Sequence, residues 1–141
     1  TAADRATGLL LANSPAWDQL SADDHAMLAH LPAPHGPLMS WLESQLHEHG
    51  HQPWAALREA LRGHVHEAFG IQQGDLAAAS LDDENAAETE EVMTRLRIEH
   101  LKALESEAIA RSGDDPSQLQ RYRELQELRK ALEHRIGHTP V

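Results

Sequence analysis

The sequence contains no cysteine, so it has no disulfide, no thiolate metal site and no thiol nucleophile. It has one Phe and one Tyr and few Val or Ile, so it is poor in the residues that β-strands prefer. No apolar run approaches the ~20 residues of a membrane-spanning helix, and the flanks of "GLLLA" are not those of a signal peptide. These absences predict a cytoplasmic protein. The abundant residues are good helix formers, so we predict an all-α fold.

Basic residues are scarce and unevenly placed. The net charge is −11, yet residues 121–141 hold five of the 12 basic residues and only three of the 23 acidic ones. An acidic body repels phosphate backbones, so we expect no direct nucleic-acid binding by residues 1–120. The basic end either binds an acidic partner or forms a solvated helix face. Because the chain begins at Thr1 rather than Met, we expect a piece of a longer protein.

Helix start and stop residues divide the first part of the chain into short helices. Ser14 before Pro15 and Ser21 before an acidic turn are typical N-caps, and Gly50 is typical of a helix end. Leu9, Leu10 and Leu11 are expected in the core. We therefore predict a multi-helix bundle over residues 1–95.

A long helix from about Ala86 to Arg111 follows, and its apolar residues change face along its length. "SGDDP" then breaks the chain, with Asp115 as a cap for a last helix. That helix carries an apolar stripe about 80° wide, made of Leu125, Leu128, Leu132 and Ile136. The short connection predicts an antiparallel hairpin, and we assign residues 96–141 to it together with the end of the long helix. The change of face predicts a hinge in the long helix.

Two motifs suggest metals but have simpler interpretations. "HEHGH", from His47 to His51, matches the H-E-x-x-H pattern of zinc proteases, which needs a continuous helix. Gly50 lies inside the motif and Pro53 follows it, so adventitious metal binding or a solvated helix end is favoured over catalysis. The acids at 82–84 more plausibly complement the dipole of the long helix than bind a metal.

The order of three stretches resembles a known family. "RATGLLLANSPAW", "LRIEHLKALESEAIAR" and "QLQRYRELQELRKAL" together resemble the C-terminal helicase-binding domain of bacterial replicative DNA primase (DnaG-type). The resemblance spans nearly the whole chain and is strongest over residues 96–134, whereas residues 31–80 match only in helical character. It implies a helical bundle joined by a long helix to a C-terminal hairpin.

The resemblance also implies a role. The hairpin would contact the N-terminal collar of the hexameric replicative helicase (DnaB-type) and bring primase to the replication fork in the bacterial cytoplasm, and the bundle would modulate the helicase. The catalytic domains of such primases lie elsewhere, so this piece would be no enzyme and would need no cofactor. The family's contacts fall on Lys130 and His134, while the tail "RIGHTPV" departs from shorter members. From the residues themselves we add an apolar and a charged set of candidates: Arg121, Leu125, Leu128, Arg129, Leu132, Glu133, Arg135 and Ile136.

Two other functions remain open. The helicase collar domain itself has a similar bundle and a comparable "GLLLANSPAW" opening, and it would self-associate through its hairpin. A zinc hydrolase built on "HEHGH" would bind zinc tightly through His47. For the primase domain, a weak homodimer through the hairpin is a further interpretation of the apolar stripe, and each leucine could equally serve only to close the hairpin.

Overall fold

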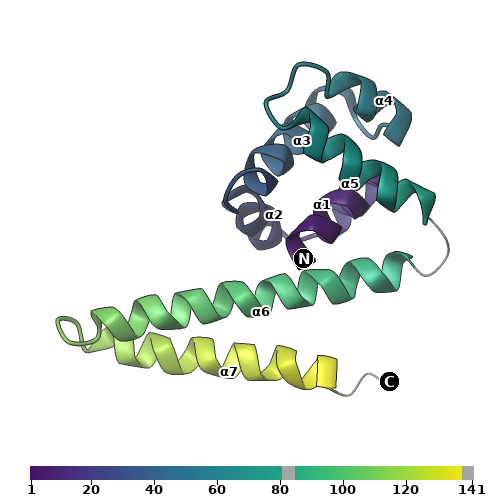
Figure 1. Ribbon diagram of the computed structural model, residues 1–141. Coiled ribbons are helices and arrows are strands. Elements are labelled where there is room, and N and C mark those ends of the chain that lie inside the picture. Colours follow the sequence, from purple (N-terminus) through teal and green to yellow (C-terminus); the bar gives the residue numbers. More distant parts are fainter. Residues whose placement is uncertain (81–84, 138–141) are drawn as a thin grey trace. The chain divides into compact units, whose positions relative to one another are not determined.

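The computed structural model describes residues 1–80 and 85–137, and over these ranges every regular element is a helix (Figure 1). This confirms the predicted all-α class. The elements, in chain order, are α1 (Ala2–Ala12), η1 (Ser14–Gln19), α2 (Ala22–Ala29), α3 (His35–His49), α4 (Trp54–Ala60), α5 (Glu67–Ala79), α6 (Asn85–Arg111) and α7 (Ser117–Gly137). No helix within the described ranges has both the length and the apolar character to cross a membrane.

The chain forms two compact units, Thr1–Val92 and Met93–Val141. The division falls inside α6, three residues before the boundary that we predicted from the sequence. In the first unit, α1 packs against α5 and α3, and α2 packs against α3. Leu9, Leu10 and Leu11 are at most 2% exposed, which confirms their predicted place in the core.

Close approach of α1 and α5 depends on a glycine. A Cβ on Gly8 would lie 2.5 Å from the backbone oxygen of Gln73. On the other side of α5, a Cβ on Gly74 would lie 2.3 Å from the ring of Trp54, whose indole N–H donates to Asp75 at 2.9 Å. Gly8 on α1 and Gly74 on α5 therefore allow α5 to pack closely against α1 and against the Trp54 ring. A search for apolar periodicity does not detect such contacts.

Most of the predicted helix ends agree with the structure. Ser21 forms a capping box with Asp24 at the start of α2, and Gly50 ends α3 with a φ of 72°. Ser14 is the exception. Its buried hydroxyl donates to the backbone oxygen of Gln52 at 3.0 Å and accepts from the Gln52 N–H at 3.2 Å, while Asn13 takes the cap position of η1. A long-range pairing has replaced the predicted local cap.

Two salt bridges of the first unit join segments far apart in the sequence. The guanidinium of Arg5 donates to both carboxylate oxygens of Glu88 at 2.8 and 2.7 Å. On α3, the His35 ring nitrogen Nε2 lies 2.6 Å from Oδ1 of Asp4, and the His35 ring meets Phe69 edge to face. These contacts join the N-terminal half of α1 to α6 and to α3.

Candidate functional site

The hairpin of the second unit is the candidate site, and its turn is built as the sequence predicted. Within this unit, α6 ends at Arg111 and α7 begins at Ser117. The carboxylate of Asp115 accepts hydrogen bonds from the Ser117 N–H at 3.0 Å and from its hydroxyl at 2.7 Å. These bonds lower the pKa of Asp115. Asp115 is thus the predicted helix cap, and the short turn returns α7 antiparallel to α6 (Figure 1).

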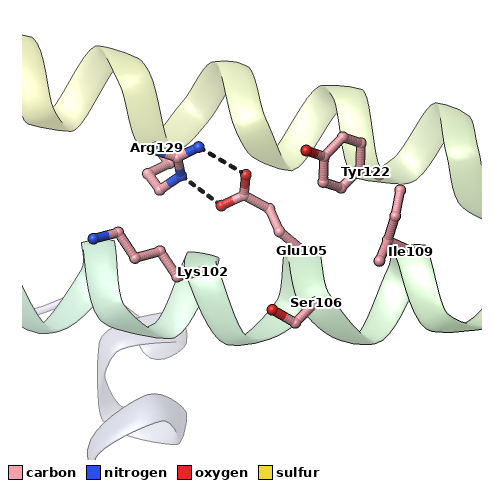
Figure 2. Close-up of a pocket in the computed structure, with 6 residues that line it drawn as sticks. All are labelled: Lys102, Glu105, Ser106, Ile109, Tyr122 and Arg129. Atoms are coloured by element: carbon pink, nitrogen blue, oxygen red, sulfur yellow. Dashed lines mark hydrogen bonds and ion pairs between the residues drawn. The ribbon is translucent and has the colours of Figure 1, made fainter.

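A bidentate ion pair lies between the two helices (Figure 2). Nε and Nη2 of Arg129 donate to the two carboxylate oxygens of Glu105 at 2.6 and 3.1 Å, and Nη1 donates to Glu133 at 2.6 Å. The side chains of Arg129 and Glu105 are only 19% and 7% exposed. The two carboxylates raise the pKa of Arg129, with Glu105 the larger cause, and Arg129 lowers the pKa of Glu133.

Arg129, which we had named as a candidate binding residue, therefore lies in the seam of the hairpin. The reason is that the antiparallel register brings a carboxylate of α6 opposite the guanidinium, and two parallel N–H···O bonds form in one plane. A pair of this kind holds the two helices in one register, because removing either partner would leave the other poorly solvated. The seam is thus closed by a charged group as well as by leucines.

The four apolar residues of the predicted stripe differ in exposure. Leu125 is 7% exposed, whereas Leu128 is 58% exposed, and Leu132 and Ile136 are half-buried. Successive helical residues are rotated by about 100°, so Leu128 lies about 60° from Leu125 around α7. Leu125 thus faces the seam, and Leu128 lies beyond its edge.

The remaining predicted residues are distributed around α7. Glu133 is half-buried beside Arg129, while four others are exposed: Arg121, Lys130, His134 and Arg135. Arg121 and Arg135 lie on the side of Leu128, and Lys130 and His134 lie on the far side of the helix. Lys130 and His134, which the resemblance implied, therefore lie on a different face of α7 from Leu128.

An open hollow of the hairpin is lined by Arg129 and by five residues that we had not singled out as candidates from the sequence (Figure 2). Tyr122 and Ile109 lie on its side nearer the turn, and Lys102 on its other side, with the ion pair between them. Only the antiparallel register brings these side chains together. Spacing about the turn does not predict this pair, because Glu105 lies six residues before the end of α6 and Arg129 lies twelve residues after the start of α7.

The "HEHGH" motif does not form a zinc-protease site in the described residues. Helix α3 ends at His49, so His47 and His51 do not share a helical face, and His51 instead contacts the carboxylate of Asp18. Within residues 1–80 and 85–137, no group of three or more potential ligands could hold a metal ion. The predicted dipole-complementing acids, residues 82–84, lie outside the described residues.

Comparisons of the chain with protein-family models, with curated proteins and with solved structures found no match.

Proposed function

We propose that this chain is the helicase-binding domain of a bacterial replicative DNA primase. The observation that carries the proposal is the hairpin, in which a seam closed by Leu125 and the Arg129–Glu105 pair leaves Leu128 exposed on the outside. In this proposal the helicase buries Leu128, which the fold of the hairpin leaves 58% exposed. The order of the three stretches that resemble the primase domain supports the same reading.

In this proposal the two compact units have separate tasks. The hairpin docks on the N-terminal domain of the hexameric helicase, and the bundle of Thr1–Val92 modulates that helicase at the fork. The chain acts by binding alone, so it needs neither a catalytic group nor a cofactor of its own. The whole chain has a net charge of −11, and its acidic body repels the phosphates of DNA. In this proposal, other domains of the primase contact DNA. The site of action is the bacterial cytoplasm.

The collar domain of the helicase itself is the second candidate. The exposed Leu128 favours it as much as it favours the primase domain, because a collar domain would bury this residue against a second copy. The two candidates differ in their behaviour alone in solution. A primase domain stays monomeric at micromolar concentration and binds helicase, whereas a collar domain self-associates.

Calorimetric titration of the chain into the cognate replicative helicase tests the proposal. We expect saturable binding, its loss on deletion of residues 112–141, and an intact bundle in the deleted protein, monitored by the fluorescence of Trp17, Trp41 and Trp54. Leu128→Asp is a cleaner point variant than Leu132→Asp, because Leu132 is half-buried in the hairpin. Absence of binding by the intact chain, with a mass in solution above that of the monomer, would replace the primase proposal by the collar domain.

A further inference from the structure

The open hollow of the hairpin has an apolar end and a cationic end (Figure 2). Ile109, which is 45% exposed, and the half-buried Tyr122 lie at the end nearer the turn, and the exposed Lys102 lies at the other. Lys102 and Ile109 are seven residues apart on α6. This interval spans about 10.5 Å along the helix axis and drifts by only about 20° around it. The hollow therefore follows α6 for about two turns.

The apolar end of the hollow continues onto α7. Leu119 is 40% exposed and precedes Tyr122 by three residues, so the two side chains are neighbours on the helix surface. The seam of the hairpin is closed by the buried Leu125 and by the ion pair, so its closure does not account for the exposure of Ile109 and Leu119. A single exposed apolar residue is ordinary, whereas apolar side chains that gather around a hollow are typical of an interaction surface.

The charged residues of the hollow leave one cation for a partner. Arg129 is bonded to Glu105 and Glu133. Lys102 forms no hydrogen bond or ion pair within the described residues. The hydrogen bond from Arg129 and, at longer range, the charge of Lys102 lower the pKa of Glu133. Two cations and one carboxylate line the hollow, so its lining is positive in a chain whose net charge is −11.

We propose that the hollow binds an acidic amphipathic helix of the replicative helicase, and this inference rests on the proposed function of the hairpin. The helix places a large apolar side chain between Ile109 and Tyr122, and a carboxylate about seven residues away meets Lys102. The open hollow, with a volume of about 480 Å³, accepts such a side chain, whereas a small molecule would stay largely exposed in it. Leu128 lies about 120° from Tyr122 around α7, so a second segment of the helicase buries Leu128.

Shape and charge argue against a second copy of this chain as the occupant. In a two-fold symmetric dimer the same surface meets itself, so hollow would face hollow and neither would be filled. Each copy also has a net charge of −11, which opposes self-association. A helix of another protein presents a convex surface to the hollow, and its carboxylate pairs with Lys102, which fixes the register of the complex.

Two matched pairs of variants test the inference by calorimetric titration into the cognate hexameric helicase. Ser106→Phe fills the hollow from an exposed position of α6, and Ala110→Phe adds the same ring at an exposed position that does not line the hollow. We expect the first to weaken binding at least about tenfold and the second less than about threefold. Lys102→Glu reverses the cation of the hollow, and Arg62→Glu makes the same charge change in the first unit. We expect losses of about tenfold and less than about threefold. Circular dichroism of each variant checks that the helices remain folded.

The pattern of losses separates the hollow from other surfaces. Equal losses within either pair would overturn the inference, because binding would then not depend on the hollow or on its cation. Full affinity of Ser106→Phe, with binding lost in Leu128→Asp, would also overturn it while leaving the proposed function standing. Absence of binding by the unmodified chain would overturn both. Self-association of the chain that is lost in Ser106→Phe, measured by sedimentation, would make a second copy the occupant and overturn the inference.

Discussion

Leu125→Ala and Leu128→Ala are the same chemical change at two positions of one apolar stripe, and the structure predicts opposite consequences. Leu125 is 7% exposed and Leu128 is 58% exposed. Truncating a buried leucine costs roughly 2 to 5 kcal/mol. We place Leu125→Ala at the low end, about 2 kcal/mol, because a two-helix hairpin relaxes around a small cavity. For Leu128→Ala we expect a change within about 0.5 kcal/mol.

Hydrogen exchange of the α7 amides measures this difference locally, since the two units need not unfold together. A loss of about 2 kcal/mol corresponds to roughly 30-fold faster exchange. We expect this acceleration for Leu125→Ala and less than threefold for Leu128→Ala. All three tryptophans of the chain precede residue 93, so their fluorescence provides an internal control and should not change in either variant.

Equal acceleration in the two variants would refute the reasoning. It would mean that Leu128 closes the seam of the hairpin as Leu125 does. The binding experiments separate the two residues again. Leu128→Ala should weaken helicase binding while α7 stays protected, whereas any loss of binding in Leu125→Ala should follow its loss of protection.

Two further predictions concern the bundle. Gly8→Ala should destabilise the bundle by about 1 to 2 kcal/mol, because crowding against the Gln73 oxygen, 2.5 Å from the added Cβ, outweighs a gain in helix propensity of about 1 kcal/mol. A higher melting temperature of the variant would contradict this prediction. Gly113→Ala is the unstrained control, because nothing lies within 4 Å of a Cβ added there. The hydrogen bond with His35 lowers the pKa of Asp4 from its ordinary 3.8. The ionised carboxylate therefore stabilises the bundle above pH 3.8, and this stabilisation is lost as the pH falls through the pKa that Asp4 has in the folded protein. An acid titration of tryptophan fluorescence should show a shallower loss in Asp4→Asn, and an unchanged profile would exclude the contribution.

The helices were largely predictable because their signals are local. Ser21, Gly50 and Asp115 act through hydrogen bonds and backbone conformations that involve only nearby residues, and each lies at the helix end that the sequence indicated. The prediction for Ser14 was wrong because its hydroxyl pairs with Gln52, 38 positions away. Residues 67–79 form one helix, α5, which packs closely against α1 and Trp54, and no local signal in the sequence indicates these contacts.

The sequence by itself determined the helical class, the antiparallel hairpin at the end of the chain and the stripe of leucines on α7, because composition, periodicity and turn residues are read along the chain. Only the tertiary structure decided which part of that stripe is buried. Leu125 and Leu128 are equivalent in the sequence pattern, but the register of α6 against α7 brings Glu105 opposite Arg129. With this ion pair formed, Arg129 lies in the seam and Leu128 lies outside it, since a helix can present only one face to its neighbour.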